Sequence, residues 1–164
     1  DIKDIDLSLM LNDQNDTLAI SKHLCGSATD LTLRCMSKIT NKKGTVIAMC
    51  CRHVCNSRDY INPEYIKKVI SNSEEDLSYE EFFKCLTKIS SYATSSYKES
   101  EKNKGVHFTG LNVDERTKIG LIARRTIDEG RLQWCKKEWN EGSNIIKYCD
   151  YETTLENVAL IIPI

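Results

Sequence analysis

Two short apolar runs separated by one helical segment constrain the fold more than any other feature of this sequence. The runs "TLAISKHL" (17–24) and "TVIAMCC" (45–51) are typical of buried strands, and the second is rich in β-branched residues. The residues between them predict a helix over residues 28–39. A strand, a helix and a second strand in this order form a right-handed parallel crossover. The sequence therefore predicts an α/β fold built on a parallel pair of strands.

Local signals add detail to this unit. Because its residues are almost all apolar or small, we expect the first strand to be buried on both faces, as in a parallel sheet. Ser27 is a natural N-cap of the helix, and Asp30 places a negative charge near the positive end of the helix dipole. Helical spacing predicts a buried stripe that comprises Ala28, Leu31, Cys35 and Ile39.

Further helices and two strands follow. We expect a short helix opened by Pro63, a helix over residues 79–93 capped by Ser78, and a long helix over residues 113–139. In the long helix, Gly130 predicts a bend or break, and the buried face is expected to comprise Ile119, Ile122, Ala123 and Ile127.

The remaining segments complete the predicted fold. Polar residues crowd the segment 94–112, which we expect to be a mobile loop. The last apolar runs predict two strands that form a hairpin. This order of elements matches the second half of an open α/β sheet that is mostly parallel, has an antiparallel last strand and carries helices on its faces.

Length and charge limit the functional classes. The 164 residues fit one domain, and no apolar run approaches the roughly 20 residues that cross a bilayer. The net charge of −1 does not indicate a strongly basic nucleic-acid binder, so we expect no DNA partner. Eight cysteines without a secretory signal predict reduced thiols in the cytoplasm or nucleus. The absence of an initiator methionine indicates a piece of a longer protein.

Reactive side chains follow both strands of the crossover. Lys22, His23 and Cys25 leave the first strand, and the cluster "CCRHVC" (50–55) leaves the second. Ligands of open α/β sheets bind outside the carboxyl ends of the parallel strands. Because neighbouring strands lie about 4.8 Å apart, we expect the two clusters to share a pocket.

Two other chemistries compete for these side chains. Cys50, Cys51, His53 and Cys55 are zinc-ligand types, and Cys25 could join them, but the spacing lacks paired CxxC motifs. Adjacent cysteines on a strand also point to opposite faces. A cysteine nucleophile with a histidine base is the other alternative, without a recognisable protease signature. We therefore expect no metal ligand here.

A second basic group lies in the long helix. Arg124, Arg125 and Arg131 occur in "ARRTIDEGR". One interpretation is a solvated helix face with local ion pairs. The other is a phosphate-contacting surface, since arginine binds phosphate oxygens in bidentate geometry.

Four strings in this order resemble one enzyme family: "SKHLCGSATDLTLRCM", "AMCCRHVC", "IGLIARRTIDEGR" and "LENVALI". The chain is similar to the eukaryotic tRNA 2′-O-methyltransferases that modify the fourth nucleotide of the acceptor stem. The resemblance implies a Rossmann-like methyltransferase that uses S-adenosylmethionine and binds the tRNA acceptor stem. It also implies that residues 1–164 are the carboxyl-terminal part of the methyltransferase domain, without the upstream cofactor loop and zinc modules. We expect such a piece to be inactive alone.

The resemblance also assigns roles to residues. It implies Lys22 for substrate positioning and His53 for proton handling. Cofactor contacts are expected from Asp1, with Asp4 or Asp6 as alternatives, and from His23 and Cys25. Contacts to tRNA are expected from Arg52, Arg124, Arg125 and Arg131.

The sequence departs from the family pattern at several positions. Arg52 and Val54 stand where the family has His and Arg in CCHHRC, and Ala123 replaces a family cysteine. Only His53 can therefore take a histidine role in this cluster. A non-catalytic RNA-binding module and a small metal-binding domain remain alternative functions.

Overall fold

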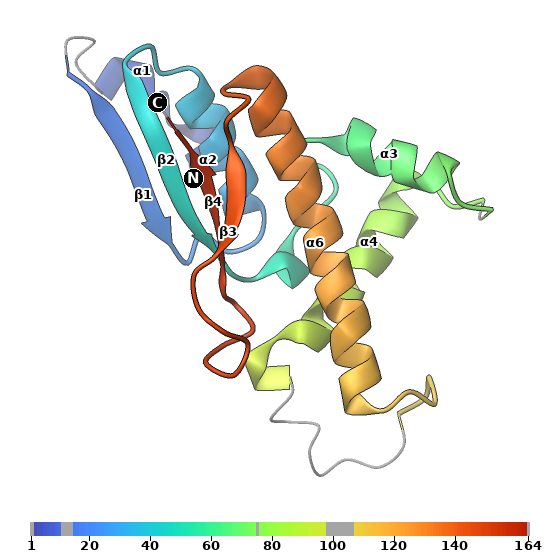
Figure 1. The fold of residues 1–164 in the computed structure, drawn as a ribbon. Helices are drawn as coiled ribbons and strands as arrows, with labels where there is room; N and C mark the ends of the chain where they lie inside the picture. Colours follow the sequence, from blue (N-terminus) through green and yellow to red (C-terminus); the bar gives the residue numbers. More distant parts are fainter. Residues whose placement is uncertain (1, 11–14, 75, 98–106, 164) are drawn as a thin grey trace.

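The computed structural model describes residues 2–10, 15–74, 76–97 and 107–163, and it has the predicted α/β architecture (Figure 1). The first elements are η1 (Ile2–Asp4), α1 (Leu7–Met10), β1 (Thr17–Lys22), α2 (Ser27–Ser37), β2 (Lys42–Met49) and η2 (Arg52–Val54). The later elements are α3 (Pro63–Ser71), α4 (Tyr79–Ser90), η3 (Ser91–Ala93), α6 (Val113–Glu138), β3 (Asn144–Lys147) and β4 (Val158–Ile162).

The four described strands form one mixed sheet in the order β1-β2-β4-β3. β1 and β2 are parallel and are joined through α2, which confirms the predicted crossover. β3 and β4 form the predicted antiparallel hairpin, and β4 lies antiparallel to β2 as well. Three strands therefore run in one direction, and the last strand opposes them.

The first helix of the crossover differs from the prediction. α2 runs from Ser27 to Ser37, and its buried side chains are Ser27, Thr29, Asp30, Leu33 and Met36. The predicted stripe through Ala28, Leu31 and Cys35 is wrong for these three residues, which are only partly buried. The apolar pattern failed here because a charged side chain, Asp30, occupies the centre of the buried face.

Two helices begin where local signals predicted. α3 has Pro63 in its first turn, and the Asn62 side chain accepts a hydrogen bond from the Tyr65 backbone N–H. Ser78 caps α4 through a capping box with Glu81. These contacts involve residues three positions apart, so the sequence alone is sufficient to predict them.

Helix α6 is the centre of the molecule because it packs between two apolar cores (Figure 1). One core lies between the sheet, α2 and α6 and includes Leu33, Ile47, Leu132 and Leu160. The other lies between α6, α3 and α4 and includes Tyr60, Ile66, Phe83, Leu86, Ala123 and Ile127. A helix with a core on each side needs a wide buried surface.

The predicted buried face of α6 is half right. Ala123 and Ile127 are buried, whereas Ile119 and Ile122 are exposed. The helix also continues through Gly130 without a break. A Cβ at this position would lie 2.1 Å from the Tyr60 hydroxyl oxygen, so Gly130 allows the close approach of two segments.

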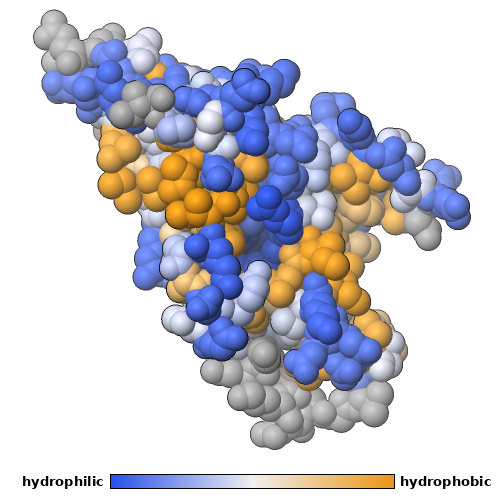
Figure 2. All heavy atoms as spheres, in the orientation of Figure 1, coloured by the Kyte–Doolittle hydropathy of each residue, from blue (hydrophilic) through white to orange (hydrophobic). Residues whose placement is uncertain are grey.

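One face of the sheet is open in the described part of the chain. Alternate residues of β1 are exposed, including Leu18 and Ile20, so the expectation that β1 is buried on both faces is wrong. Ile146 of β3 is exposed as well. Figure 2 shows an apolar patch over the sheet in this view. The described helices that form the cores pack against the opposite face, although helices were expected on both.

The predicted mobile loop at 94–112 falls in part on residues 98–106, which lie outside the described residues. On its carboxyl side, Asn112 caps α6 through a capping box with Glu115.

Candidate active site

The two strand-end clusters lie at the same edge of the sheet. Lys22 at the end of β1 is in register with Ala48 of β2, so the segments that follow the two strands leave the sheet side by side. The Cys25 sulfur lies 3.3 Å from the Cys50 sulfur, and the Gly26 backbone N–H donates to the Cys51 carbonyl oxygen over 3.0 Å. The two clusters are therefore in contact at these residues, whereas the pocket that they were expected to share stays a prediction.

Gly26 permits this close approach. Its φ of 59° lies in the left-handed region, and a Cβ there would lie 2.5 Å from the Val54 carbonyl oxygen. A side chain would therefore combine backbone strain with a clash against the neighbouring loop. The glycine that ends the first strand signal thus holds the two loops against each other.

Arg52 anchors the second cluster from inside the protein. Its side chain is 1% exposed, and Nε and Nη2 donate to the carboxylate of Asp128 over 2.6–3.1 Å. Nη1 donates to the carbonyl oxygens of Met49 and Cys50. These bonds fix the backbone just after β2. The guanidinium faces inward and donates to protein acceptors. It therefore does not present these donors to a tRNA phosphate, which was the role expected for Arg52.

Arg131 joins this network from the next turn of α6. Nε and Nη2 donate to Asp30 over 3.0 and 2.6 Å, and Nη1 lies 3.4 Å from Asp128. Nη2 also donates to the Gly26 carbonyl oxygen. The network of Arg52, Asp128, Arg131 and Asp30 therefore ties both loops and α2 to α6. The neighbouring aspartates hold the pKa of Arg131 well above its usual range, against the effect of burial.

The capping role expected for Ser27 is wrong, because Gly26 is the N-cap of α2 and makes no side-chain capping bond. The Ser27 hydroxyl instead accepts a hydrogen bond from the Asn56 backbone N–H over 3.1 Å. Asp30 lies in the first turn of α2, as predicted from the helix dipole. It is also fully buried against Arg131, a partner 101 residues away that no local signal indicates.

The other two arginines of α6 differ from each other. Arg125 is exposed and pairs with Glu129 one turn later over 2.9 Å, as the solvated-face interpretation predicts. Arg124 is buried, donates from Nη1 to the Ala93 carbonyl oxygen and lies 3.6 Å from Glu156. Its Nη2 has no hydrogen-bond partner among the described residues. Burial and the nearby Arg52 charge lower the pKa of Arg124 to about 10.

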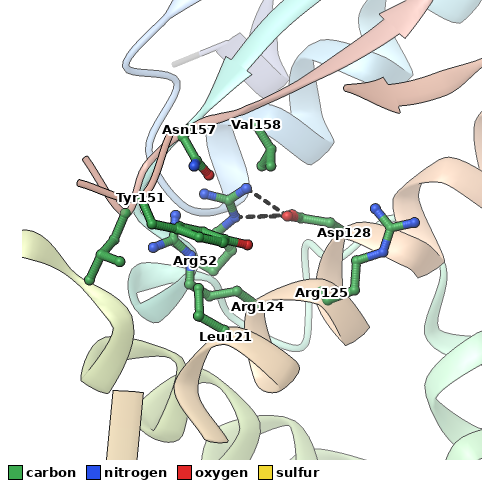
Figure 3. Close-up of a pocket in the computed structure, with 9 residues that line it drawn as sticks. Arg52, Leu121, Arg124, Arg125, Asp128, Tyr151, Asn157 and Val158 are labelled. Carbon is green, nitrogen blue, oxygen red and sulfur yellow. Dashed lines mark hydrogen bonds and ion pairs between the residues drawn. The ribbon is translucent and has the colours of Figure 1, made fainter. Parts of the chain in front are cut away.

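A small cavity adjoins Arg124. Its volume is about 60 Å³, and Figure 3 shows Arg52 facing Asp128 at this site. Its lining comprises Arg52, Leu121, Arg124, Arg125, Asp128, Tyr151, Leu155, Asn157 and Val158. The three arginines that line the cavity each have a carboxylate neighbour, in Asp128, Glu156 and Glu129. The Nη2 group of Arg124 is the donor at this cavity that has no hydrogen-bond partner among the described residues.

His53 is exposed, as is its neighbour Val54 in the second cluster. Burial of part of its ring lowers its pKa, the positive charge of Arg124 lowers it further, and Glu156 acts in the opposite direction. The imidazole is therefore mainly neutral at pH 7 and can accept a proton. The charges of Arg124 and Glu156 thus act on the pKa of His53 in opposite directions.

The side chains after β1 reach solvent. Lys22 lies on the open face of the sheet with Leu18 and Ile20, and His23 is exposed with a φ of 64°. Asp1 lies outside the described residues. No hydrogen bond or ion pair in the described structure joins Lys22 to His53. The structure thus groups His53 with Arg124 and Glu156, and Cys25 with Cys50 and Cys51.

The thiols of the second cluster are poor nucleophiles. Burial and the hydrogen bond to Cys25 raise the pKa of Cys50, and the same two causes raise the pKa of Cys51 to about 12. Since the thiolate is the reactive form, neither thiol suits the cysteine-nucleophile alternative at neutral pH.

Asp128 and Glu156 were not predicted from the sequence. A signal for Asp128 was available, because Arg124, Asp128 and Arg131 are spaced four and three residues apart and share one helix face. No local signal identifies Glu156, which reaches Arg124 from the loop before β4.

In the described part of the chain, no helix has the length and apolar character needed to span a membrane.

Comparison with known proteins gives a consistent result. The family model described as "Methyltransferase TRM13" matches residues 1–163. A relative from Vanderwaltozyma polyspora is 45% identical over 98% of this chain and 40% of its own length. Relatives from Kluyveromyces lactis and Saccharomyces cerevisiae are 46% and 36% identical, over 98% and 99% of this chain and 39% and 40% of their own lengths.

All three relatives are named "tRNA:m(4)X modification enzyme TRM13". The chain spans about two fifths of the length of these relatives. No solved structure matches it.

Proposed function

Because the chain belongs to the TRM13 methyltransferase family, we propose that it forms part of an enzyme that methylates a ribose 2′-oxygen of tRNA with S-adenosylmethionine. The site of modification in this proposal is the acceptor stem. The observation that carries the proposal is the meeting of two reactive clusters at the carboxyl ends of the parallel strands β1 and β2. This edge is where open α/β sheets bind their ligands.

The arrangement of strands supports the proposed fold. A β1-α2-β2 crossover, three strands in one direction and an opposing last strand suit the second half of a Rossmann-like sheet. The exposed apolar face of β1 and the chain's share of its relatives' length are consistent with further protein packing on this side.

His23 and Cys25 are suited to the edge of a cofactor site. Both are exposed at the end of β1, where the positive φ of His23 turns the chain away from the sheet. Polar side chains at this position would contact the polar groups of S-adenosylmethionine, and Asp1 is proposed as a further contact. The cofactor supplies a methyl group bound to a sulfonium. The residues of this chain would align the accepting hydroxyl and manage its proton.

Proton handling is proposed for His53. Transfer to the 2′-oxygen releases the hydroxyl proton, and a neutral imidazole can accept it. The lowered pKa of His53 keeps the ring neutral at pH 7. Lys22 is proposed to orient the ribose through its ammonium group, since in-line transfer requires reacting atoms within about 3 to 3.5 Å.

Contacts to tRNA are proposed for Arg124 and Arg125. Arg125 is exposed, and the Nη2 group of Arg124 has no partner among the described residues beside the small cavity. Arg52 and Arg131 would act indirectly, because their guanidinium groups hold the loops through Asp128 and Asp30.

The test uses the whole protein that contains this chain. We expect Lys22→Ala and His53→Ala to lower the rate of methyl transfer to tRNA by at least about 100-fold, in the range of lost acid–base catalysis. Lys88→Ala changes an exposed lysine of α4 and is the matched control. Tritiated S-adenosylmethionine and a tRNA with a 2′-deoxy nucleotide at the target position identify the acceptor oxygen.

Three outcomes would contradict the proposal. Wild-type rates from both variants would exclude the assigned roles. Undiminished methylation of the 2′-deoxy tRNA would exclude the ribose oxygen as acceptor. Binding of tRNA without any methylation by the whole protein would favour a non-catalytic RNA-binding module. We further expect the 164-residue chain alone to show no activity.

A further inference from the structure

Three thiols converge beside the candidate active site. The sulfur atoms of Cys25, Cys50 and Cys51 all lie within 4.8 Å of one another. From this geometry we propose that the three residues bind a Zn²⁺ ion as thiolates. The proposal does not depend on the methyltransferase function.

The ligand set differs from the one considered from the sequence. Cys55 points elsewhere, because its sulfur accepts a hydrogen bond from Arg131 over 3.2 Å. His53 lies near Arg124 and Glu156. Cys25, from the segment that follows β1, takes the place of Cys55 and His53 in the ligand set.

Adjacent cysteines can face one ion here because they do not lie in a strand. β2 ends at Met49, and Cys51 has φ −88° and ψ 79°, outside the extended geometry that alternates side chains between faces. The backbone turn after β2 directs both thiols toward Cys25.

The distances suit zinc with small adjustments. A Zn–S bond of about 2.3 Å in tetrahedral geometry separates two sulfur atoms by roughly 3.8 Å. The Cys25 and Cys50 sulfurs are 3.3 Å apart, and the third sulfur lies within the 4.8 Å limit. Small side-chain rotations that shift the sulfur atoms by a fraction of an ångström would therefore place the three sulfurs around one ion.

The backbone that carries the thiols is already fixed. Gly26, next to Cys25, donates its N–H to the Cys51 carbonyl oxygen. The Cys50 carbonyl oxygen accepts a hydrogen bond from the buried guanidinium of Arg52. A site supported in this way loses little conformational freedom when it binds a metal.

The number and type of ligands define the site further. No histidine or carboxylate of the described residues completes this cluster within the same distance. Three thiolates favour zinc over magnesium or calcium, which prefer oxygen ligands. Because Cys25 is exposed, the fourth position faces solvent and can take water or another donor. The ion would clamp the exits of β1 and β2 next to Lys22 and His53.

The experiment uses the 164-residue chain, purified with a phosphine reductant and freed of metal with a chelator. Zinc content is measured by mass spectrometry after dialysis against Zn²⁺. Binding of Co²⁺ is followed through the sulfur-to-cobalt charge-transfer band in the near ultraviolet. We expect about one Zn²⁺ per chain, a charge-transfer band, and a rise in the melting temperature when metal binds.

Variants test the ligands. Cys25→Ser, at the exposed position, and Cys50→Ser should each weaken Zn²⁺ affinity by more than about tenfold and reduce the charge-transfer band. Cys85→Ser changes an exposed cysteine of α4 and should leave both unchanged. Circular dichroism verifies that each variant is folded. If a variant does not fold, the zinc content and the cobalt spectrum of the wild-type chain still test the proposal.

Three results would overturn the proposal. One is the absence of Zn²⁺ and of a cobalt–sulfur band in reduced, folded wild-type chain. Another is unchanged affinity in folded Cys25→Ser and Cys50→Ser variants. A mapped Cys25–Cys50 disulfide that forms in air in the presence of Zn²⁺ would likewise show that these thiols are a redox pair.

Discussion

The buried ion pair of Asp30 and Arg131 should contribute more to the free energy of unfolding than most other contacts of the protein. Asp30 is fully buried, Arg131 is 1% exposed, and two hydrogen bonds of 3.0 and 2.6 Å join them. Asp30→Leu removes the carboxylate while it keeps the branched shape of the side chain, and it leaves the buried guanidinium with a weaker partner, Asp128 at 3.4 Å. Breaking one side of a buried ion pair costs about 3 to 5 kcal/mol.

This cost is large against the total stability of a domain, which is about 5 to 15 kcal/mol. For a chain of this length, 1 kcal/mol shifts the melting temperature by roughly 2 to 4 °C, so Asp30→Leu should lower it by about 6 to 20 °C. Arg125→Ala is the matched control on the same helix, because it breaks an exposed pair with Glu129. Exposed pairs of this spacing contribute about 0.3 to 0.5 kcal/mol.

Urea denaturation followed by circular dichroism measures both free energies of unfolding. The double variant Asp30→Leu with Arg131→Met should recover most of the loss, because an apolar pair replaces both buried charges. A loss of less than about 1 kcal/mol in the free energy of unfolding of Asp30→Leu would contradict this prediction. So would a double variant less stable than the single one, since the penalty would then not come from an uncompensated charge.

Two further predictions concern packing and pH. Gly130→Ala should destabilise the protein by about 1 to 3 kcal/mol in urea denaturation, because its Cβ would lie 2.1 Å from the Tyr60 hydroxyl oxygen, and this clash exceeds the gain in helix propensity. Arg124→Gln should raise the pKa of His53, and Glu156→Gln should lower it, because each removes a charge that acts on the ring. Histidine NMR titrations, assigned with His53→Asn, measure both shifts; equal pKa values in wild type and variants would contradict this account. In the whole enzyme, the acidic limb of the rate profile should move to higher pH in Arg124→Gln, since His53 would be protonated at higher pH.

Local signals were enough to predict several elements. The helices α3 and α4 begin where Pro63 and Ser78 indicate, because these signals act within the first turn of a helix. The hairpin of β3 and β4 also follows from two apolar runs joined by a polar segment. The buried faces of α2 and α6 were predicted only in part, since buried charged residues occupy positions at their centres.

The candidate site, like the fold, could be predicted only in part from the sequence. The strand ends were predictable, because a parallel crossover places the exits of β1 and β2 at one edge. The direction of each side chain was not. Arg52 points inward to Asp128 and His53 is exposed, although the two are neighbours in the chain. Only the position of α6, more than 70 residues away, distinguishes them.

Contiguous patterns along the chain were enough to predict the α/β class, the crossover, the final hairpin and the resemblance to tRNA methyltransferases. The buried pair of Asp30 with Arg131 and the contact of Cys25 with Cys50 and Cys51 emerged only in the folded protein. Burial and charge pairing depend on segments that packing brings together. A local pattern identifies the side chains that are present, but the distant partner determines their role.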